Sequence, residues 1–193
     1  SYSVTDLALS SLNDGTLTIT ADVSDLAGNA ATQASDTTTK DCTAPTITIS
    51  SDVASLGIGE TATLTFTLSE ASSNFVQSDV TVSGGTLSNW SAASSTSYSA
   101  TFTPSTNNTT DGVISVASDT FTDAANNANT NGSDSNNTVT LSVDTIRPTI
   151  AVSSDLSSLK AGEAATLTFT LSESCSDFIE SDVSVSGGSL SNW

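Results

Sequence analysis

The sequence predicts an all-β protein built from tandem two-layer sandwiches, with about seven strands in each 103-residue repeat. Three observations predict this fold. The chain repeats itself, apolar and polar residues alternate along short runs, and turns rich in Gly and Asn separate those runs. Strong helix formers such as Glu, Lys and Arg are scarce, so we expect almost no helix.

The repeat appears at an offset of 103 residues. Residues 41–90 match residues 144–193 at 33 of 50 positions without a gap, and residues 63–70 recur unchanged at 166–173. The opening segment is a more distant relative, since residues 14–15 and 25–29 resemble residues 111–112 and 123–127. We therefore expect residues 1–40 to be the last part of one repeat, 41–143 a complete repeat, and 144–193 the first part of the next.

Short alternating runs predict the strands of the complete repeat. Residues 61–69 place Ala62, Leu64, Phe66 and Leu68 on one face and polar residues on the other, a pattern typical of a half-buried strand. On this basis strands are predicted at 46–51, 61–69, 75–82, 86–90, 96–103, 111–119 and 137–143. Seven strands in this length favour an immunoglobulin-like sandwich. We expect the last three strands of such a unit in 1–40 and the first four in 144–193.

The charge balance restricts the possible partners. The chain has 21 acidic residues, 3 basic residues and no His, for a net charge of −18. Phosphate recognition needs clustered Lys and Arg, so nucleic acid and anionic membrane surfaces are excluded as partners. No apolar run approaches the roughly 20 residues of a membrane helix, so we expect no membrane insertion. The acid excess leaves two interpretations, which are solubility in a salty or extracellular setting and binding of divalent cations.

The residue types argue against catalysis. Without His, no Ser-His-Asp or Cys-His arrangement is possible, and two Cys alone do not make a zinc site. Paired carboxylates could serve glycoside hydrolysis, but the acids recur at repeat-equivalent positions, which favours a structural role. Cys42 and Cys175 fall at the same pole of successive repeats, so we expect them to remain free thiols.

Strand topology brings several oxygen ligands to one pole. Asp41 precedes the first strand, Glu70 ends the second, and Asp123 and Asn127 lie between the sixth and seventh. Because successive strands alternate in direction, these positions should converge, and oxygen-only ligands suit calcium. The same logic adds the equivalent positions of the neighbouring segments, which are Asp144, Glu173, Asp25 and Asn29. The sequence therefore predicts a structural calcium site.

Simpler roles exist for each of these residues. Asp123 and Asn127 could form only an Asx turn, Glu70 could end a strand in solvent, and Asp41 could solvate a linker. Trp90 and Trp193 are expected to pack in the core, although an exposed Trp could stack on a sugar.

Several short motifs along the chain resemble those of bacterial Ig-like repeats. The resemblance rests on residues 41–46, the strand end at 67–70, the segment 84–89 and the loop at 25–29. Such repeats occur in giant cell-surface adhesins and biofilm-associated proteins, often exported by type I secretion. The sequence departs from the pattern at three positions, with Cys42 in place of Thr, Asn126 in place of Gly, and Arg147 beside the second junction.

The resemblance implies a non-catalytic spacer on the bacterial cell surface that projects a distal binding region. It also implies calcium between repeats, neighbouring repeats of the same chain as partners, and a host or surface ligand bound elsewhere. The alternative is an accessory or carbohydrate-binding module of a secreted hydrolase or S-layer protein. Further 103-residue copies in the parent protein would favour the first interpretation, and an attached catalytic domain the second.

Overall fold

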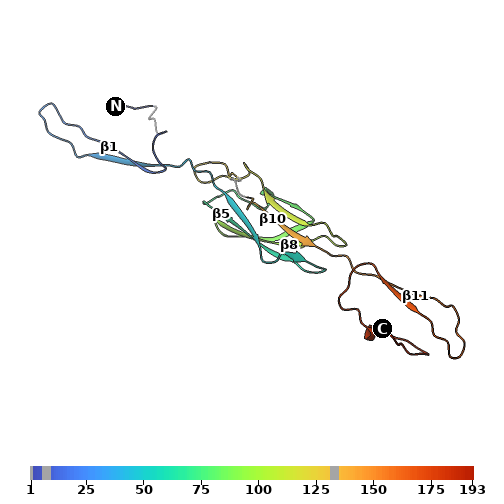
Figure 1. The fold of residues 1–193 in the computed structure, drawn as a ribbon. Coiled ribbons are helices and arrows are strands. Elements are labelled where there is room, and N and C mark those ends of the chain that lie inside the picture. The colour runs from blue at the N-terminus through green and yellow to red at the C-terminus, as the bar shows by residue number, and fades with distance from the viewer. Residues whose placement is uncertain (1, 6–9, 131–134) are drawn as a thin grey trace.

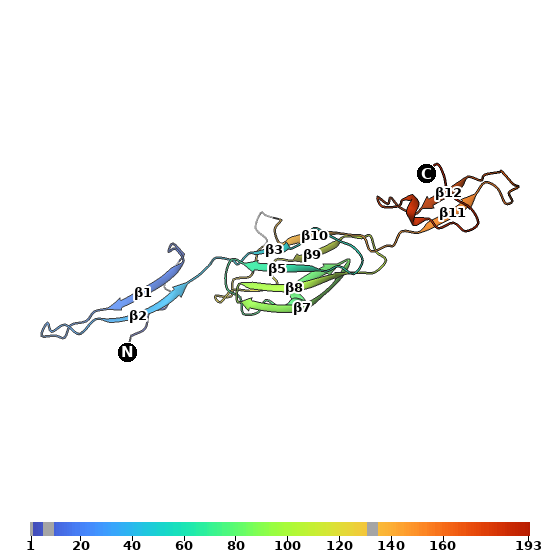
Figure 2. The ribbon, with the colours of Figure 1, turned by 90° about the horizontal axis from the view of Figure 1, so that it is seen from below.

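The computed structural model describes residues 2–5, 10–130 and 135–193. Their regular secondary structure is almost entirely β-strand, with two single-turn 3-10 helices, η1 (Gln77–Asp79) and η2 (Glu180–Asp182). Figures 1 and 2 show a strand pair, a sandwich and a second strand pair following one another along an elongated molecule. Within the described ranges, no helix has the length and apolar character needed to cross a membrane.

The sandwich consists of two four-stranded sheets. One has the order β3–β5–β8–β7, with bounds Ile47–Ser51, Ala62–Leu68, Ser97–Pro104 and Gly85–Ser94. The other has the order β4–β10–β9–β6, with bounds Ser55–Leu56, Thr138–Val143, Gly112–Val116 and Val80–Ser83. All neighbours are antiparallel except β4 and β10. This is the strand order of an immunoglobulin-like sandwich, as predicted.

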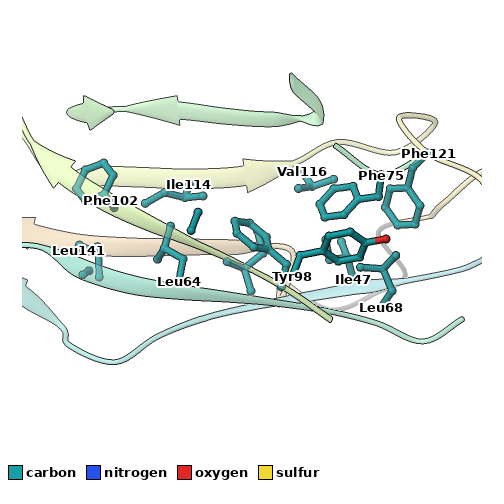
Figure 3. Packing of buried hydrophobic residues seen from close by; sticks show 14 of the residues in the cluster. Ile47, Leu64, Leu68, Phe75, Tyr98, Phe102, Ile114, Val116, Phe121 and Leu141 are labelled. Carbon is teal, nitrogen blue, oxygen red and sulfur yellow. The ribbon is translucent and has the colours of Figure 1, made fainter. Parts of the chain in front are cut away.

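The core follows from the alternation along the strands. Ala62, Leu64, Phe66 and Leu68 of β5 all point inward and are buried, while the residues between them face outward. Figure 3 shows Phe75, Phe121 and Tyr98 gathered at one end of the core and Phe102 and Leu141 at the other. The Phe75 ring lies 5.0 Å from both the Tyr98 and Phe121 rings. Burying each of these side chains contributes about 1.5–3 kcal/mol to stability.

A glycine corner carries the chain from one sheet to the other between β6 and β7. Gly84 has φ +75°, and a Cβ there would lie 2.5 Å from the Asp111 carbonyl oxygen. A Cβ on Gly85 would meet the Thr103 carbonyl oxygen and the buried ring of Phe102. The corner therefore requires both a left-handed backbone and the absence of side chains.

Two predicted strands have clearly different bounds in the structure, and one strand was not predicted. The predicted strand 75–82 begins only at Val80, because residues 77–79 form η1, which the Asp79 carboxylate closes by accepting the Val76 amide at 2.9 Å. The predicted strand 86–90 is longer, since β7 continues to Ser94 through two irregularities in register. The two-residue strand β4 was not predicted, because a parallel pair this short leaves no periodic signal.

The flanking segments form fewer strands than predicted. Residues 1–40 contribute β1 (Gly15–Ala21) and β2 (Ala34–Lys40), paired over seven residues. The first of the three strands predicted in this segment falls partly on residues 6–9, outside the described residues. Residues 2–5 form no strand. Residues 144–193 contribute β11 (Ile150–Ser154) and β12 (Leu167–Leu171), but not the predicted third and fourth strands.

Pairing explains which strands are missing after β12. In the sandwich β3 pairs with β5, and their counterparts β11 and β12 pair in the same way. By contrast, β6 pairs with β9 and β7 pairs with β8. Residues 144–193 contain no counterpart of β8 or β9, so the third and fourth strands have no ladder to join.

Candidate metal centre

Three carboxylates converge at the end of the sandwich that faces β1 and β2. Asp41 lies in the linker before β3, Glu70 lies two residues after β5, and Asp123 lies in the loop between β9 and β10. One carboxylate oxygen from each lies within 4.8 Å of the other two. Oxygen ligands held 2.3–2.6 Å from one calcium ion are at most about 5 Å apart, so this spacing fits a single ion.

Asp123 is held rigidly in an Asx turn. It is only 5% exposed. Its Oδ1 accepts the amides of Ala125 at 2.8 Å and Asn127 at 2.9 Å, and its Oδ2 accepts the Asn127 side-chain amide at 2.8 Å. Burial alone would raise the pKa of Asp123, but the hydrogen bonds from Asn127 and Ala125 bring it below its usual value. The carboxylate is therefore ionised and oriented.

Asn127 connects this turn to the linker. Its side-chain nitrogen donates to the Asp41 backbone carbonyl at 3.3 Å as well as to Asp123. These contacts position Asp41 and Asp123. Direct binding of a metal ion by Asn127 stays a prediction. Asp41 itself accepts the Thr43 amide through Oδ1 at 3.1 Å, which orients its carboxylate.

Polar side chains fasten the loop after Glu70 to the loop that carries Asp123. Ser72 is buried, and its hydroxyl donates to the Thr122 carbonyl at 2.7 Å. The Thr122 amide in turn donates to Asn74 Oδ1 at 3.0 Å, and Ser72 and Asp123 form an isolated bridge. These contacts fix the separation of the two loops, so Glu70 and Asp123 meet without requiring an ion.

The carboxylates of the cluster repel one another. Burial raises the pKa of Glu70, and the charges of Asp41, Asp123 and Asp14 raise it further. Negative charges nearby disfavour the ionised form of Glu70. A divalent cation bound among them would favour the ionised form instead. The donor set contains only oxygen, which matches the ligands that calcium takes.

The comparison with known protein families agrees with the sandwich and its repeat. The family model for the bacterial Ig-like domain matches residues 41–140 and residues 144–193. The chain belongs to the bacterial Ig-like domain family. This domain is a typically non-catalytic fold. No curated protein and no solved structure matches the chain.

A fourth acid approaches the Ig-like domain from the segment before it. Asp14, just before β1, accepts the Lys40 ammonium at 3.0 Å and the Thr43 hydroxyl at 2.8 Å. Hydrogen bonds from the Cys42 amide, Lys40 and Thr43 lower its pKa to about 2. The sequence did not predict Asp14 as a site residue. The recurrence of residues 14–15 at 111–112 was the one signal that this position has a structural role.

A second residue that sequence reasoning missed is Asn129 in the Ig-like domain. It is fully buried, and its Oδ1 accepts the amides of Thr120 at 2.7 Å and Phe121 at 3.0 Å. Its side-chain nitrogen donates to the Ala117 carbonyl at 2.8 Å. Asn129 thus shapes the loop that presents Asp123. No repeat signal marked it, because the equivalent position in the first segment is Ala31.

The other predicted ligands do not join a comparable cluster in the described part of the chain. Asp25 and Asn29 form the same Asx turn, with the Asn29 amide 2.9 Å from Asp25 Oδ1, but both are exposed. Asp144 is exposed and accepts the Ile146 amide. Glu173 keeps one buried carboxylate oxygen, Oε1, without a hydrogen-bond partner. The only group of three or more potential metal-ligating side chains among the described residues is Asp41, Glu70 and Asp123.

Trp90 packs against the core of the Ig-like domain. Its ring lies 5.3 Å from Phe66, 5.5 Å from Phe75 and 5.8 Å from Tyr98. Trp193 makes the equivalent contacts with Phe169 and Phe178, at 5.6 and 5.2 Å. Trp90 is partly buried against the core, as the sequence predicted. Trp193 makes the same ring contacts but stays 56% exposed, so the prediction of core packing is not met there.

Proposed function

We propose that this chain is a non-catalytic spacer of a bacterial surface adhesin, located outside the cell, and that calcium stiffens the junction before the complete repeat. Membership of the bacterial Ig-like domain family and the 103-residue repeat support the spacer role. The succession of units along an elongated molecule also supports it (Figure 1). A repeat that contacts only its neighbours adds reach, and a distal region would carry the adhesive function.

The convergence of Asp41, Glu70 and Asp123 is the observation that carries the calcium proposal. Asp41 belongs to the linker, whereas Glu70 and Asp123 belong to the sandwich. An ion bound by all three would tie the linker to the sandwich and remove the repulsion among the carboxylates. Without the ion, that repulsion favours separation of the linker from the pole.

The packing of Trp90 disfavours the alternative of a carbohydrate-binding module. A sugar platform needs an aromatic face open to solvent, and the partly buried Trp90 ring instead packs against Phe66, Phe75 and Tyr98. An accessory role within a larger secreted enzyme or S-layer protein would use the same stiffened junction.

Small-angle scattering of the whole chain in calcium and in EGTA tests the stiffening. We expect a longer maximum dimension and a narrower range of shapes in calcium. Glu70→Gln combined with Asp41→Asn should abolish the difference, because two of the three carboxylates are lost. The matched control is Asp119→Asn, which removes charge from an exposed residue at φ +61°, a conformation that Asn tolerates. Identical scattering of the wild-type chain in both conditions would refute the proposal.

A further inference from the structure

A buried polar residue lies in the linker after the complete repeat. Thr145 is 6% exposed, although its neighbours Asp144 and Ile146 are exposed. It is the second residue after β10 and precedes the residues that lead to β11. A buried hydroxyl is costly unless its hydrogen bonds are satisfied, so its partners indicate what holds the linker.

Thr145 is bonded entirely to the loop between β8 and β9. Its amide donates to the Asn108 carbonyl at 2.9 Å, and its hydroxyl donates to the Ser105 carbonyl at 2.7 Å. The Asn108 amide donates back to the Thr145 hydroxyl oxygen at 2.9 Å. Asn108 is itself fixed by two hydrogen bonds with Thr110, of 2.8 and 3.0 Å. The repeat offset places Thr145 in the following repeat, but these contacts attach it to the preceding sandwich.

The linker is anchored again a few residues later. The Thr149 amide donates to the Ser172 hydroxyl at 2.9 Å, and the Ser172 amide donates to the Thr149 carbonyl at 2.9 Å. Only residues 146–148 lie between the two anchors, and Pro148 has a restricted φ. The four Cα–Cα steps from Thr145 to Thr149 span at most about 14 Å, so the two units stay close together.

We propose that Thr145 is a metal-independent clasp that sets the orientation of β11 and β12 relative to the sandwich. Its hydrogen bonds involve only backbone groups and one hydroxyl, so the clasp operates whether or not calcium is present. This inference does not rest on the proposed calcium site, which lies at the opposite end of the sandwich.

The first junction also fixes its linker to the preceding unit, one repeat position later and with other groups. The Thr43 hydroxyl donates to the Asp14 carboxylate before β1 at 2.8 Å, and Lys40 pairs with the same carboxylate. The counterparts of Lys40 and Thr43 at the second junction are Val143 and Ile146, which cannot make these contacts. The second junction uses the Thr145 hydroxyl instead.

Spin labels on either side of the second junction allow a direct test in chelator. Cys175 is exposed and free, and Thr67→Cys in a Cys42→Ser background places the other label on an exposed position of β5, within the rigid sandwich. Double electron–electron resonance between them in EGTA reports the distribution of orientations across Thr145. Thr145→Val keeps the shape of the side chain and removes its hydroxyl, so we expect a clearly broader distance distribution than in the wild-type chain.

Two control variants separate the clasp from general effects. Thr145→Ser retains the hydroxyl and should keep the narrow distribution, and Thr140→Val changes an exposed residue of β10 and should also leave it narrow. Equal widths for the wild-type chain and Thr145→Val would overturn the proposal.

Hydrogen exchange gives a second readout that needs no substitution. In EGTA the Thr145 amide should be protected as strongly as the amides of β10, because it donates to Asn108 inside a buried contact. Exchange of the Thr145 amide at the rate of an open linker would also overturn the proposal.

Discussion

At the scale of single residues, the Asp123 carboxylate organises its own loop through an Asx turn that Asp25 repeats in the preceding segment. Asp25 and Asp123 each accept two backbone amides and one Asn side chain, so the same turn forms in an exposed and in a buried setting. The turn needs a left-handed residue before its Asn, which is Gly28 at φ +87° in one case and Asn126 at φ +68° in the other. The departure at Asn126 therefore preserves the backbone conformation.

Glu70→Gln should stabilise the metal-free protein. Burial and the neighbouring charges of Asp41, Asp123 and Asp14 raise the pKa of Glu70, so its ionised form is unfavourable at pH 7. We expect the Tm in EGTA to rise by about 2–4 °C. The Tm in calcium should fall below that of the wild-type chain, because a ligand is lost. Thermal melting in both conditions tests this reversal of sign, and a lower Tm in EGTA would contradict it.

The pH dependence of stability in EGTA should show the same effect. A carboxylate with a raised pKa contributes stability that is present below its unfolded value of 4.5 and is lost as pH rises through its folded value. The wild-type chain should therefore gain stability relative to Glu70→Gln as pH falls from 7 towards 4.5. Asp14, with a pKa of about 2, acts in the opposite direction only below its unfolded value of 3.8.

At the scale of strands and loops, the glycine corner between β6 and β7 is the least tolerant element. Gly85→Ala places a methyl group against the Thr103 carbonyl and the fully buried Phe102, which cannot move without disturbing the core. We expect a loss of about 2–4 kcal/mol in the free energy of unfolding, measured by urea denaturation. The control is Gly59→Ala, where a Cβ meets nothing within 4 Å and only the φ of +78° costs about 1 kcal/mol. Equal losses would show that Gly85 is not sterically limited.

Alternation in the sequence predicted the central strands well because each has one buried face. β5 and β8 bury every second residue, and this regular burial is what period-two patterning detects. The predictions were wrong where a local hydrogen bond or a missing partner decides the conformation. Asp79 closes η1 inside a predicted strand, and the third and fourth strands after β12 have no neighbours to pair with.

The acids of the site could be predicted from the sequence, but the residues that position them could not. Topology alone was sufficient to predict that Asp41, Glu70 and Asp123 converge, because alternating strands return their loops to the same pole. The roles of Asn129 and Asp14 depend on side-chain contacts between distant loops. Those contacts have no spacing rule in the sequence, so neither residue was selected.

At the scale of the whole molecule, stability is concentrated in the sandwich. The strands of the β1–β2 and β11–β12 pairs are mostly exposed on both faces, whereas the sandwich holds the cluster of buried hydrophobic residues. An isolated strand pair is marginally stable in water. Limited proteolysis of dilute monomer should therefore leave a resistant fragment near residues 41–145 and cleave both flanking segments first. Equal resistance along the whole chain would contradict this distribution of stability.

The central claim is that Asp41, Glu70 and Asp123 together bind one calcium ion, and calorimetric titration of the whole chain tests it most directly. We predict a single tight site in the wild-type chain and the same site in Asp119→Asn. Glu70→Gln should weaken binding by tenfold or more, about 1.4 kcal/mol. Absence of measurable binding at millimolar calcium, or an affinity unchanged in Glu70→Gln, would contradict the claim.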